Sequence, residues 1–375
     1  MTDDTRPDDA RPEDLQPEAR APRSGPEPHV PAAWQPELPK LGGALGEAAE
    51  DFEVDELPLY EPSGAGAHWY LWVEKRGMNT RDVVLRLAAA AGVPDQEIGS
   101  AGLKDRHAIT RQWISVPVQA TEPSSWQLPA EVKILTVTKH TNKLRTGHLL
   151  GNRFKVRLVG CHADWQQRWP ALQAALSQHG FYNYFGLQRF GAFGQNLGRA
   201  QFWIKRGAKG RGFQPRLYAS VLQSEAFNRY LSRRRELGFE APLLGEVVRL
   251  EGTGKHFRID DVNDPRWSAR DVHPTGPMAG PKMLAASDAA LELERRVIAE
   301  LGLDDTPRAF AKLAPGTRRD LLVFPQDLQL EADADAARLS FSLPSGSYAT
   351  ELISALTGAQ ARVAPPPPAA APSPE

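Results

Sequence analysis

An aspartate between two cations is the first group in this sequence that could do chemistry. Asp105 lies in the segment AGLKDRHAITRQ, with Lys104 before it and Arg106 after it. Flanking cations favour the ionised carboxylate, which can act as a nucleophile or as a general base at an electron-poor centre. Because the segment lies between a glycine and a strand-like run, we expect Asp105 on a turn. The alternative is an ordinary turn aspartate with solvated neighbours.

A second segment combines aromatic rings, amides and a cation between glycines. It reads NYFGLQRFG and runs from Asn183 to Gly191, with Phe185 and Arg189 inside it. Such a loop can stack on an unpaired base and form hydrogen bonds with its edge, as RNA-binding proteins do. The alternative is an aromatic turn in the core, which we expect for two of the three aromatic residues.

Basic residues surround both segments. We take Lys143, Arg145, Arg153 and Lys155 as candidates for contacts with an RNA backbone. On a strand, Arg153, Lys155 and Arg157 share one face, and three cations on one face can follow a phosphate chain. The alternative is a solvent-exposed strand face.

The near-zero net charge of −1 hides an uneven distribution. Residues 1–62 carry 16 acidic and 5 basic residues, and residues 326–375 carry 6 acidic and 2 basic ones, which leaves a net charge of +14 on residues 63–325. A basic body between acidic ends indicates a polyanionic partner. A fortuitous charge split is the alternative.

Several classes of protein are excluded by missing patterns. The single cysteine, Cys161, rules out an intrachain disulfide framework and a multi-cysteine metal site. The histidines lack metal-binding spacing, so we expect no metal, and a serine-hydrolase motif is absent. No apolar run is long enough to span a membrane, and the acidic N-terminus does not resemble a secretory signal. We expect a cytoplasmic location.

Strand and helix patterns alternate irregularly along the chain. Strand-like runs occur at 68–73, 112–118, 132–139, 152–159 and 337–343, and helical patterns at 80–91, 164–178, 218–237 and 283–301. This order predicts an α+β fold with a mixed, largely antiparallel sheet. The glycine-rich, basic stretch 205–216 predicts a mobile loop or a domain junction. If the late strand returns to the first sheet, residues 206–319 form an insertion.

The chemistry-bearing segments resemble the TruD family of tRNA pseudouridine synthases. The resemblance covers AGLKDRHAITRQ and NYFGLQRFG, together with DFEVDELP, HWYLWVEKRGMNT, KLRTGHLLGNRF, FPQDL and LPSGSYAT, in the order of the family. It implies a catalytic domain at 40–205 and 320–362, interrupted by an inserted α/β TRUD domain at 206–319. Residues 1–39 and 363–375, both rich in proline, are predicted as disordered tails.

The resemblance also implies the reaction and its residues. Asp105 corresponds to the catalytic aspartate, Asn183 and Phe185 line the uridine pocket, and Phe52 lies near the active site. We add Lys104 and Arg189 as substrate-binding residues. The family isomerises uridine-13 of tRNA and uses no cofactor or metal. The target base has to flip out of its stack, and Asp105 then either adds to C1′ or removes the 2′ proton.

Two other functions stay open from the residues. A non-catalytic tRNA-binding protein or RNA chaperone fits the basic body equally well, but it leaves the Asp105 segment unexplained. A hydrolase that pairs Asp105 with His107 is less favoured, because no set of nucleophile, base and orienting group is visible. For either RNA-related function we expect tRNA as the partner and a monomer.

Overall fold

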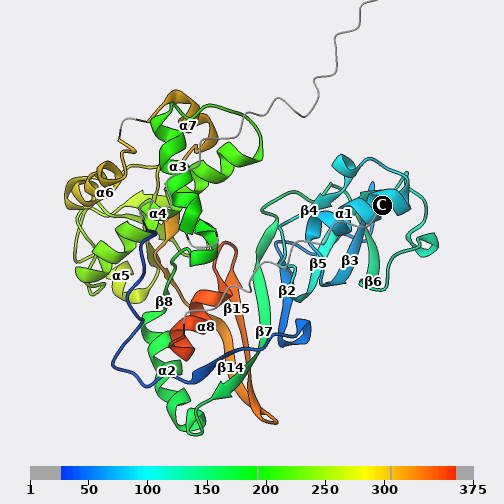
Figure 1. Ribbon diagram of the computed structural model, residues 1–375, viewed down its shortest axis with the longest axis horizontal. Helices are drawn as coiled ribbons and strands as arrows, with labels where there is room; N and C mark the ends of the chain where they lie inside the picture. The colour runs from blue at the N-terminus through cyan, green and yellow to red at the C-terminus, as the bar shows by residue number, and fades with distance from the viewer. Residues whose placement is uncertain (1–26, 192–193, 305, 360–375) are drawn as a thin grey trace, which may run out of the picture.

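The computed structural model describes residues 27–191, 194–304 and 306–359, which form two lobes (Figure 1). The helices are α1 (Thr80–Ala91), α2 (Trp165–His179), α3 (Gln195–Lys205), α4 (Phe213–Glu236), α5 (Pro265–Ala269), α6 (Asp288–Glu300), α7 (Arg308–Leu313) and α8 (Ala349–Thr357). The strands are β1 (Gly42–Leu45), β2 (Phe52–Pro58), β3 (His68–Arg76), β4 (Gly99–Ser100), β5 (Ile109–Pro117), β6 (Val132–His140), β7 (Leu149–Cys161), β8 (Phe181–Tyr182), β9 (Val247–Leu250), β10 (His256–Arg258), β11 (Val272–Met278), β12 (Thr317–Asp320), β13 (Leu322–Val323), β14 (Gln326–Asp333) and β15 (Ala336–Pro344).

A nine-stranded sheet runs through the first lobe and beneath the second. Its main path is β14-β15-β7-β2-β5-β3-β6, with β1 paired to β7 and β4 paired to β5. Among the described strands of this sheet, β2 and β5 pair in parallel and the other neighbours pair antiparallel. The predicted α+β class with a largely antiparallel sheet is confirmed, and so is the return of the late strand to the first sheet.

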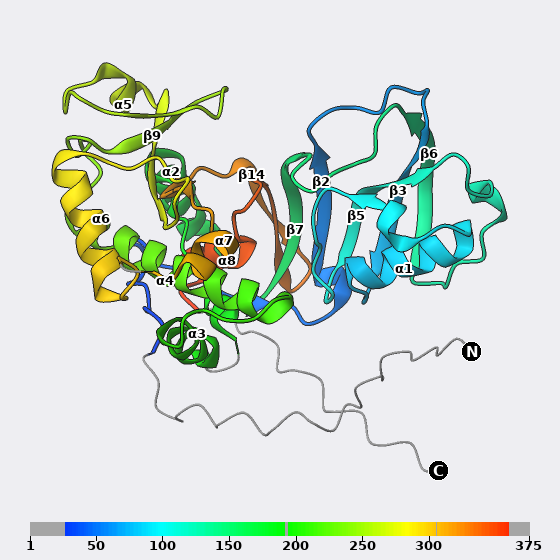
Figure 2. The ribbon, with the colours of Figure 1, turned by 90° about the horizontal axis from the view of Figure 1, so that it is seen from above.

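Two groups of helices cover the same face of this sheet. Val54 of β2 lies opposite Thr110 of β5, and opposite residues on paired strands point to one face. On this face, α1 packs on β3 and β5 at one end, whereas α2 and α8 pack on β7 and β15 at the other (Figures 1 and 2). The strip of sheet between the two groups of helices is therefore left for polar residues.

Helix α1 shows why the local pattern was informative. Its apolar residues Val83, Val84 and Leu87 recur at helical spacing and are buried against the sheet. The helix ends at Gly92, whose φ of 70° places it in the left-handed conformation that suits a helix C-terminus. The predicted helix over 80–91 is confirmed at both ends.

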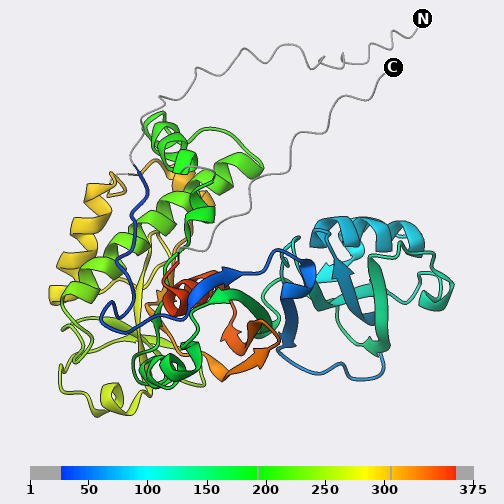
Figure 3. The same ribbon diagram turned by 60° about the horizontal axis from the view of Figure 1, so that its bottom comes forward.

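The second lobe is built around the long helix α4. A four-stranded sheet, in the order β10-β9-β11-β12, packs with α4, and α3, α6 and α7 complete the lobe (Figure 3). Two buried ion pairs lie inside it, Arg234 with Glu246 at 2.9 Å and Arg318 with Glu294 at 2.7 Å. Loss of one partner would leave an unpaired buried charge, so these pairs constrain how the lobe packs.

The predicted loop between the two parts of the chain is shorter than expected. The stretch 205–216 is only partly loop, because α3 ends at Lys205 and α4 begins at Phe213. The core of the second lobe already includes Tyr184 and Leu197, well before residue 206; the insertion limits 206 and 319 stay a prediction.

The predicted N-terminal tail is also too long. Its residues 27–39 are described and lie along the second lobe. Trp34 is 6% exposed in the core that the large sheet shares with α2 and α8, and its indole N–H donates a hydrogen bond to the Gly180 carbonyl at 2.9 Å. The high proline content of this segment led us to predict a disordered tail, although it contains this buried tryptophan. Residues 1–26 and the predicted tail 363–375 lie outside the described residues.

The packing of α8 on the large sheet gives a test of this fold. Leu356 is 0% exposed in the core shared by α8 and the sheet. We expect Leu356→Ala to lower the free energy of unfolding by about 2–5 kcal/mol, because it leaves a cavity. Leu135→Ala, on β6 where Leu135 is 47% exposed, is the matched control and should change it by less than about 0.5 kcal/mol. If urea unfolding shows the same decrease in the free energy of unfolding for both variants, this packing is contradicted.

Candidate active site

A polar row crosses the strip of sheet between the two groups of helices. Glu56 of β2 lies directly opposite Asn152 of β7, and the parallel register of β2 with β5 brings Gln112 next to Glu56. Glu56 and Gln112 are almost fully buried, with exposed fractions of 3% and 1%. Burying such groups is costly unless they are hydrogen-bonded, so this row needs partners from above the sheet.

The turn that carries Asp105 supplies those partners. The ammonium group of Lys104 lies 2.8 Å from a Glu56 carboxylate oxygen and donates a hydrogen bond to Asn152 Oδ1 at 2.7 Å. The Gln112 side-chain amide donates to the Gly102 carbonyl at 3.0 Å. Burial raises the pKa of Glu56, and the charge of Lys104 opposes that shift. Lys104 is thus buried beneath the turn, and its predicted contact with substrate has little support in this geometry.

Helix α1 fixes the same turn from the other side. The first residue of α1, Thr80, accepts a hydrogen bond from the Lys104 backbone N–H at 2.9 Å and donates one to Gln112 at 3.0 Å. Both bonds are buried. The backbone immediately before Asp105 is therefore held by a helix end and by the sheet together.

Asp105 itself is exposed at the top of this turn. Lys75 of β3 donates a hydrogen bond from its ammonium group to the Asp105 carbonyl at 2.5 Å. Burial lowers the pKa of Lys75 to about 8, while the Asp105 carboxylate acts in the opposite direction. The structure thus presents an exposed carboxylate on a backbone that is bonded from below, next to a lysine whose charge can change near neutral pH.

The loop 142–148 packs against this turn. The Gly147 N–H donates to the Ala101 carbonyl at 2.8 Å, and Lys143 donates to the Gln96 carbonyl. Arg145 is exposed on this loop. Of the predicted RNA-backbone residues, Lys143 and Arg145 therefore lie beside the Asp105 turn.

The other two predicted backbone contacts lie on the opposite face of the sheet. Arg153 and Lys155 alternate with the residues of the polar row along β7. Both share one exposed face, as predicted. The same face carries Asp55 and Glu53, which lie opposite them in register and form ion pairs with Arg111, and Asp327 lies 3.8 Å from Arg153. This face balances its own charges, which favours the solvated strand face over a phosphate track.

The second segment is clamped onto helix α4. The Phe185 backbone N–H donates to Asn228 Oδ1 at 2.8 Å, and the Asn228 amide donates back to the Phe185 carbonyl at 2.9 Å. The Phe185 ring is 6% exposed, and the Arg319 guanidinium lies 4.1 Å from its centroid. Stacking of Phe185 on a flipped uridine, which stays a prediction, would need this ring or Arg319 to move.

The polar members of this segment are used inside the protein. The Asn183 amide donates to the Asp320 carbonyl at 2.9 Å, and its Oδ1 accepts a hydrogen bond from Arg319 at 2.6 Å. Arg189 donates to Ser224 of α4 at 3.3 Å. Both side chains hold the segment in place, and their predicted contacts with the substrate remain predictions.

A chain of hydrogen bonds joins the two segments across the sheet. Lys104 contacts Asn152 of β7, and β7 pairs with β15 up to Pro344. Ser345 then donates to the Leu150 carbonyl at 2.9 Å, and Arg319 donates to the Gly346 carbonyl at 2.7 Å. Since Arg319 also holds Asn183, the Asp105 turn and the NYFGLQRFG segment are connected through described contacts.

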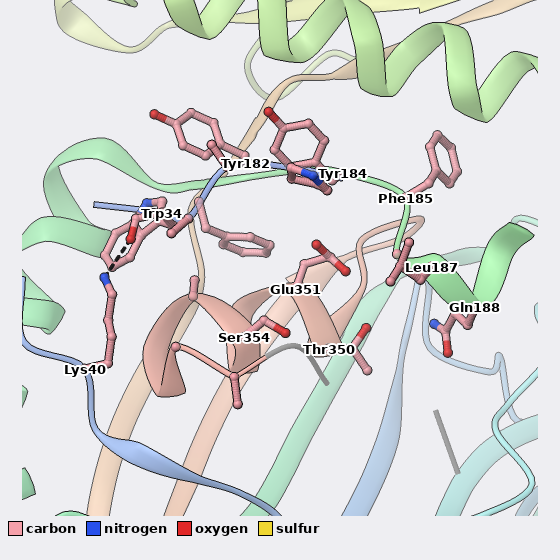
Figure 4. Close-up of a pocket in the computed structure, with 18 residues that line it drawn as sticks. Trp34, Lys40, Tyr182, Tyr184, Phe185, Leu187, Gln188, Thr350, Glu351 and Ser354 are labelled. Carbon is pink, nitrogen blue, oxygen red and sulfur yellow. Dashed lines mark hydrogen bonds between the residues drawn. The ribbon is translucent and has the colours of Figure 1, made fainter. Parts of the chain in front are cut away.

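A cavity of about 370 Å³ lies between α8, the segment 181–188 and residues 31–34 (Figure 4). Glu351 projects from α8 toward Gly186, where a Cβ atom would come 2.7 Å from the carboxylate. Burial raises the pKa of Glu351 to about 7, against the effect of Arg319, and lowers the pKa of Arg319 to about 10. Asp105 does not line this cavity, so the cavity is a neighbour of the candidate site.

The sequence pattern did not single out several residues that position the site. These are Lys75, Glu56, Thr80, Gln112, Asn152 and Arg319. The first five lie within the quoted motifs but were hidden among other polar residues, whereas Arg319 lies outside them. Phe52, predicted near the active site, packs in the core with its ring 6.0 Å from Phe154, and its contact with substrate stays a prediction.

Known proteins match this chain over most of its length. A family model described as tRNA pseudouridine synthase D (TruD) matches residues 33–199 and 214–355. The tRNA pseudouridine synthase D of Anaeromyxobacter dehalogenans (strain 2CP-C) is 43% identical over 340 residues, which cover 87% of this chain and 96% of the relative. That of a Thermus thermophilus strain is 38% identical over 322 residues, covering 84% and 89%.

A solved structure shares the fold. The tRNA pseudouridine synthase D structure from Methanosarcina mazei superposes with a TM-score of 0.66 at 22% identity and covers 88% of this chain and 96% of that one. Within the described residues, no helix is long and apolar enough to cross a membrane, and no cluster of three potential metal ligands occurs. With a family model that spans most of the chain and relatives of nearly the same extent, the chain belongs to the TruD family of tRNA pseudouridine synthases.

Proposed function

We propose that this pseudouridine synthase isomerises uridine-13 of tRNA and that Asp105 is its catalytic residue. The observation that carries the proposal is the position of Asp105. Its side chain is exposed, while the backbone around it is held by Thr80, Lys75 and the buried Lys104. A carboxylate on a preorganised turn is what an enzyme needs to attack a reacting carbon at a fixed position.

The reaction exchanges one bond to C1′ for another. The N1–C1′ bond breaks and the C5–C1′ bond forms, while C5 loses a proton and N1 gains one, so the product is an isomer of the substrate. Positive charge develops at C1′ as the first bond breaks, and a carboxylate stabilises such a centre in glycosidases. Asp105 either adds to C1′ or removes the 2′ proton to give a glycal. Deuterium at C2′ distinguishes these routes by a kinetic isotope effect, because only the second route breaks the bond between C2′ and its hydrogen.

The proposal extends to the partner and the setting of the enzyme. The target base must leave its stack, which costs a few kcal/mol, and the exposed Arg145 beside the Asp105 turn is suited to hold the displaced backbone. We propose a monomeric cytoplasmic enzyme that needs no cofactor. Activity that survives EDTA and follows the monomer peak in size-exclusion chromatography would support this.

The substitution Asp105→Asn tests the catalytic assignment. Removing the carboxylate should lower kcat on the order of 10⁴-fold or more, since no neighbour replaces it at C1′. The affinity for tRNA should stay within about twofold, because Asp105 is exposed and does not support the fold. The readouts are tritium release from C5 of labelled uridine and the position of pseudouridine in the tRNA sequence.

Two results would contradict this assignment. Loss of tRNA binding together with activity would make Asp105 a structural residue. A folded wild-type protein that binds tRNA but forms no pseudouridine would favour the non-catalytic RNA-binding function. Product at a position other than 13 would contradict the substrate assignment alone.

The pKa of Lys75, which is lowered to about 8, predicts a pH dependence. If its charge supports the neighbouring Asp105 carboxylate, kcat should fall as the pH rises through about 8, toward the level of Lys75→Met. Stability should change in the opposite direction. Between about 8 and 10.5 the unfolded chain binds the Lys75 proton more tightly, so the free energy of unfolding should rise with pH.

The variant Lys133→Met is the matched control for this experiment, because Lys133 is an exposed lysine on β6. It should keep the wild-type pH profile of kcat, whereas Lys75→Met should lose the step near pH 8. If the change in kcat near pH 8 persists in Lys75→Met, it arises from another group, and the role of the Lys75 charge is refuted.

A further inference from the structure

The connection between α3 and α4 carries an unbalanced positive charge. No aspartate or glutamate occurs between Asp164 and Glu225. Six basic residues are exposed in this region, namely Arg199, Lys205, Arg206, Lys209, Arg211 and Arg216. In the described part of the chain none of the six forms an ion pair with a carboxylate. With no carboxylate in this stretch of the sequence, these cations are available to an external anion.

Exposed aromatic rings stand among these cations. Phe213, the first residue of α4, is 80% exposed, and Phe202 of α3 is 39% exposed. The guanidinium of Arg206 lies over the Phe202 ring at 4.5 Å. Cations that contact phosphates, together with rings on which bases stack, form the surfaces that bind single-stranded nucleic acids.

The connection is built to hold this arrangement. The Trp203 indole N–H donates to the Lys209 carbonyl at 2.8 Å, and Ala208 is 1% exposed. Neither the hydrogen bond nor the burial of Ala208 involves the side chains of Lys209 and Arg211. The backbone is thus pinned while the charged side chains remain outside, which limits the ordering cost of binding.

The same hairpin is attached to the candidate active site. Arg189, in the Phe185 segment, bonds to Ser220 and Ser224 of α4. From Ser220 back to Phe213 the helix extends by about 10 Å. This length corresponds to about three nucleotides along one strand of a nucleic acid. In all three views the start of α4 points toward the lobe that carries α1 and the Asp105 turn (Figures 1, 2 and 3).

We propose that the α3–α4 hairpin, residues 199–216, binds the RNA strand beside the target nucleotide. Lys209 and Arg211 contact phosphates, and Phe213 stacks on a base. The inference rests on the proposed tRNA substrate. It adds a binding surface that lies almost entirely between the stretches 33–199 and 214–355 matched by the family model.

The test compares two double variants that each remove two exposed arginine or lysine charges. K209A/R211A alters the hairpin, and R295A/R296A alters α6, where both arginines are exposed. For K209A/R211A we expect tRNA affinity at 0.1 M salt to fall on the order of tenfold, with a shallower salt dependence. R295A/R296A should match the wild type in tRNA affinity and in kcat.

Phe213→Ala separates stacking from charge. Loss of one stacked base predicts a fall in affinity of about five- to a hundredfold with an unchanged salt dependence. Since Phe213 is largely exposed, this variant should melt at the wild-type temperature, so weaker binding would not reflect unfolding.

The outcomes distinguish this inference from the proposed function. If the wild type forms pseudouridine but K209A/R211A binds tRNA like R295A/R296A, the hairpin surface is refuted and the enzyme assignment stands. If the wild type binds tRNA without forming product, the enzyme assignment fails and the affinity comparison still decides the hairpin. Hairpin-dependent sedimentation with phosphatidylglycerol vesicles, with tRNA affinity unaffected, would make the surface a membrane contact and overturn the proposal.

Discussion

The ammonium group of Lys104 lies between Glu56 and Asn152, directly beneath the turn that presents Asp105. Both charges are almost fully removed from water, so neither can be left without the other. Such a pair adds little net stability compared with apolar residues of the same size, but it permits few alternative geometries. We infer that this contact positions the turn over the sheet, together with the bonds from Thr80 and Gln112.

The same constraint reaches the second lobe through the sheet. Asn152 lies on β7, whose pairing with β15 ends just before Ser345 and Gly346. The Gly346 carbonyl accepts a hydrogen bond from Arg319, and Arg319 fixes Asn183 and lies over Phe185. Two segments that are far apart in the chain are thereby held by one continuous set of strand and side-chain contacts. The proposed stacking of a substrate base on Phe185 would require this ring or Arg319 to move, and it would then link substrate entry to the packing of the second lobe.

The sequence predicted the elements whose structure depends on neighbouring residues in the chain. The apolar spacing and the terminal glycine defined α1, and the alternation in residues 337–343 predicted β15. Strand β14 was not predicted, because its side chains are mostly polar and leave no apolar alternation. Helix α3 was missed because the glycines and charges that follow it suggested a longer loop.

The candidate site was predictable only in part, because its contacts join distant residues. Asp105 stood out by its flanking cations, but the same segment led us to predict Lys104 as a substrate-binding residue, whereas it is buried beneath the turn. Its burial depends on Glu56, which reaches it only once β2 and β5 pair in parallel. Likewise, Arg153 and Lys155 share a face, as strand geometry requires, but their acidic neighbours come from the pairing with β2.

The double substitution E56L/K104M tests most directly whether the buried pair positions Asp105. Replacing both charges with apolar side chains should keep the free energy of unfolding within about 2 kcal/mol of the wild type. The affinity for tRNA should be preserved, while kcat for pseudouridine formation should fall about 10²-fold, because a small displacement of a catalytic group is enough for such a loss. A folded double variant with the wild-type kcat would show that the turn holds Asp105 without the pair, and would contradict this account.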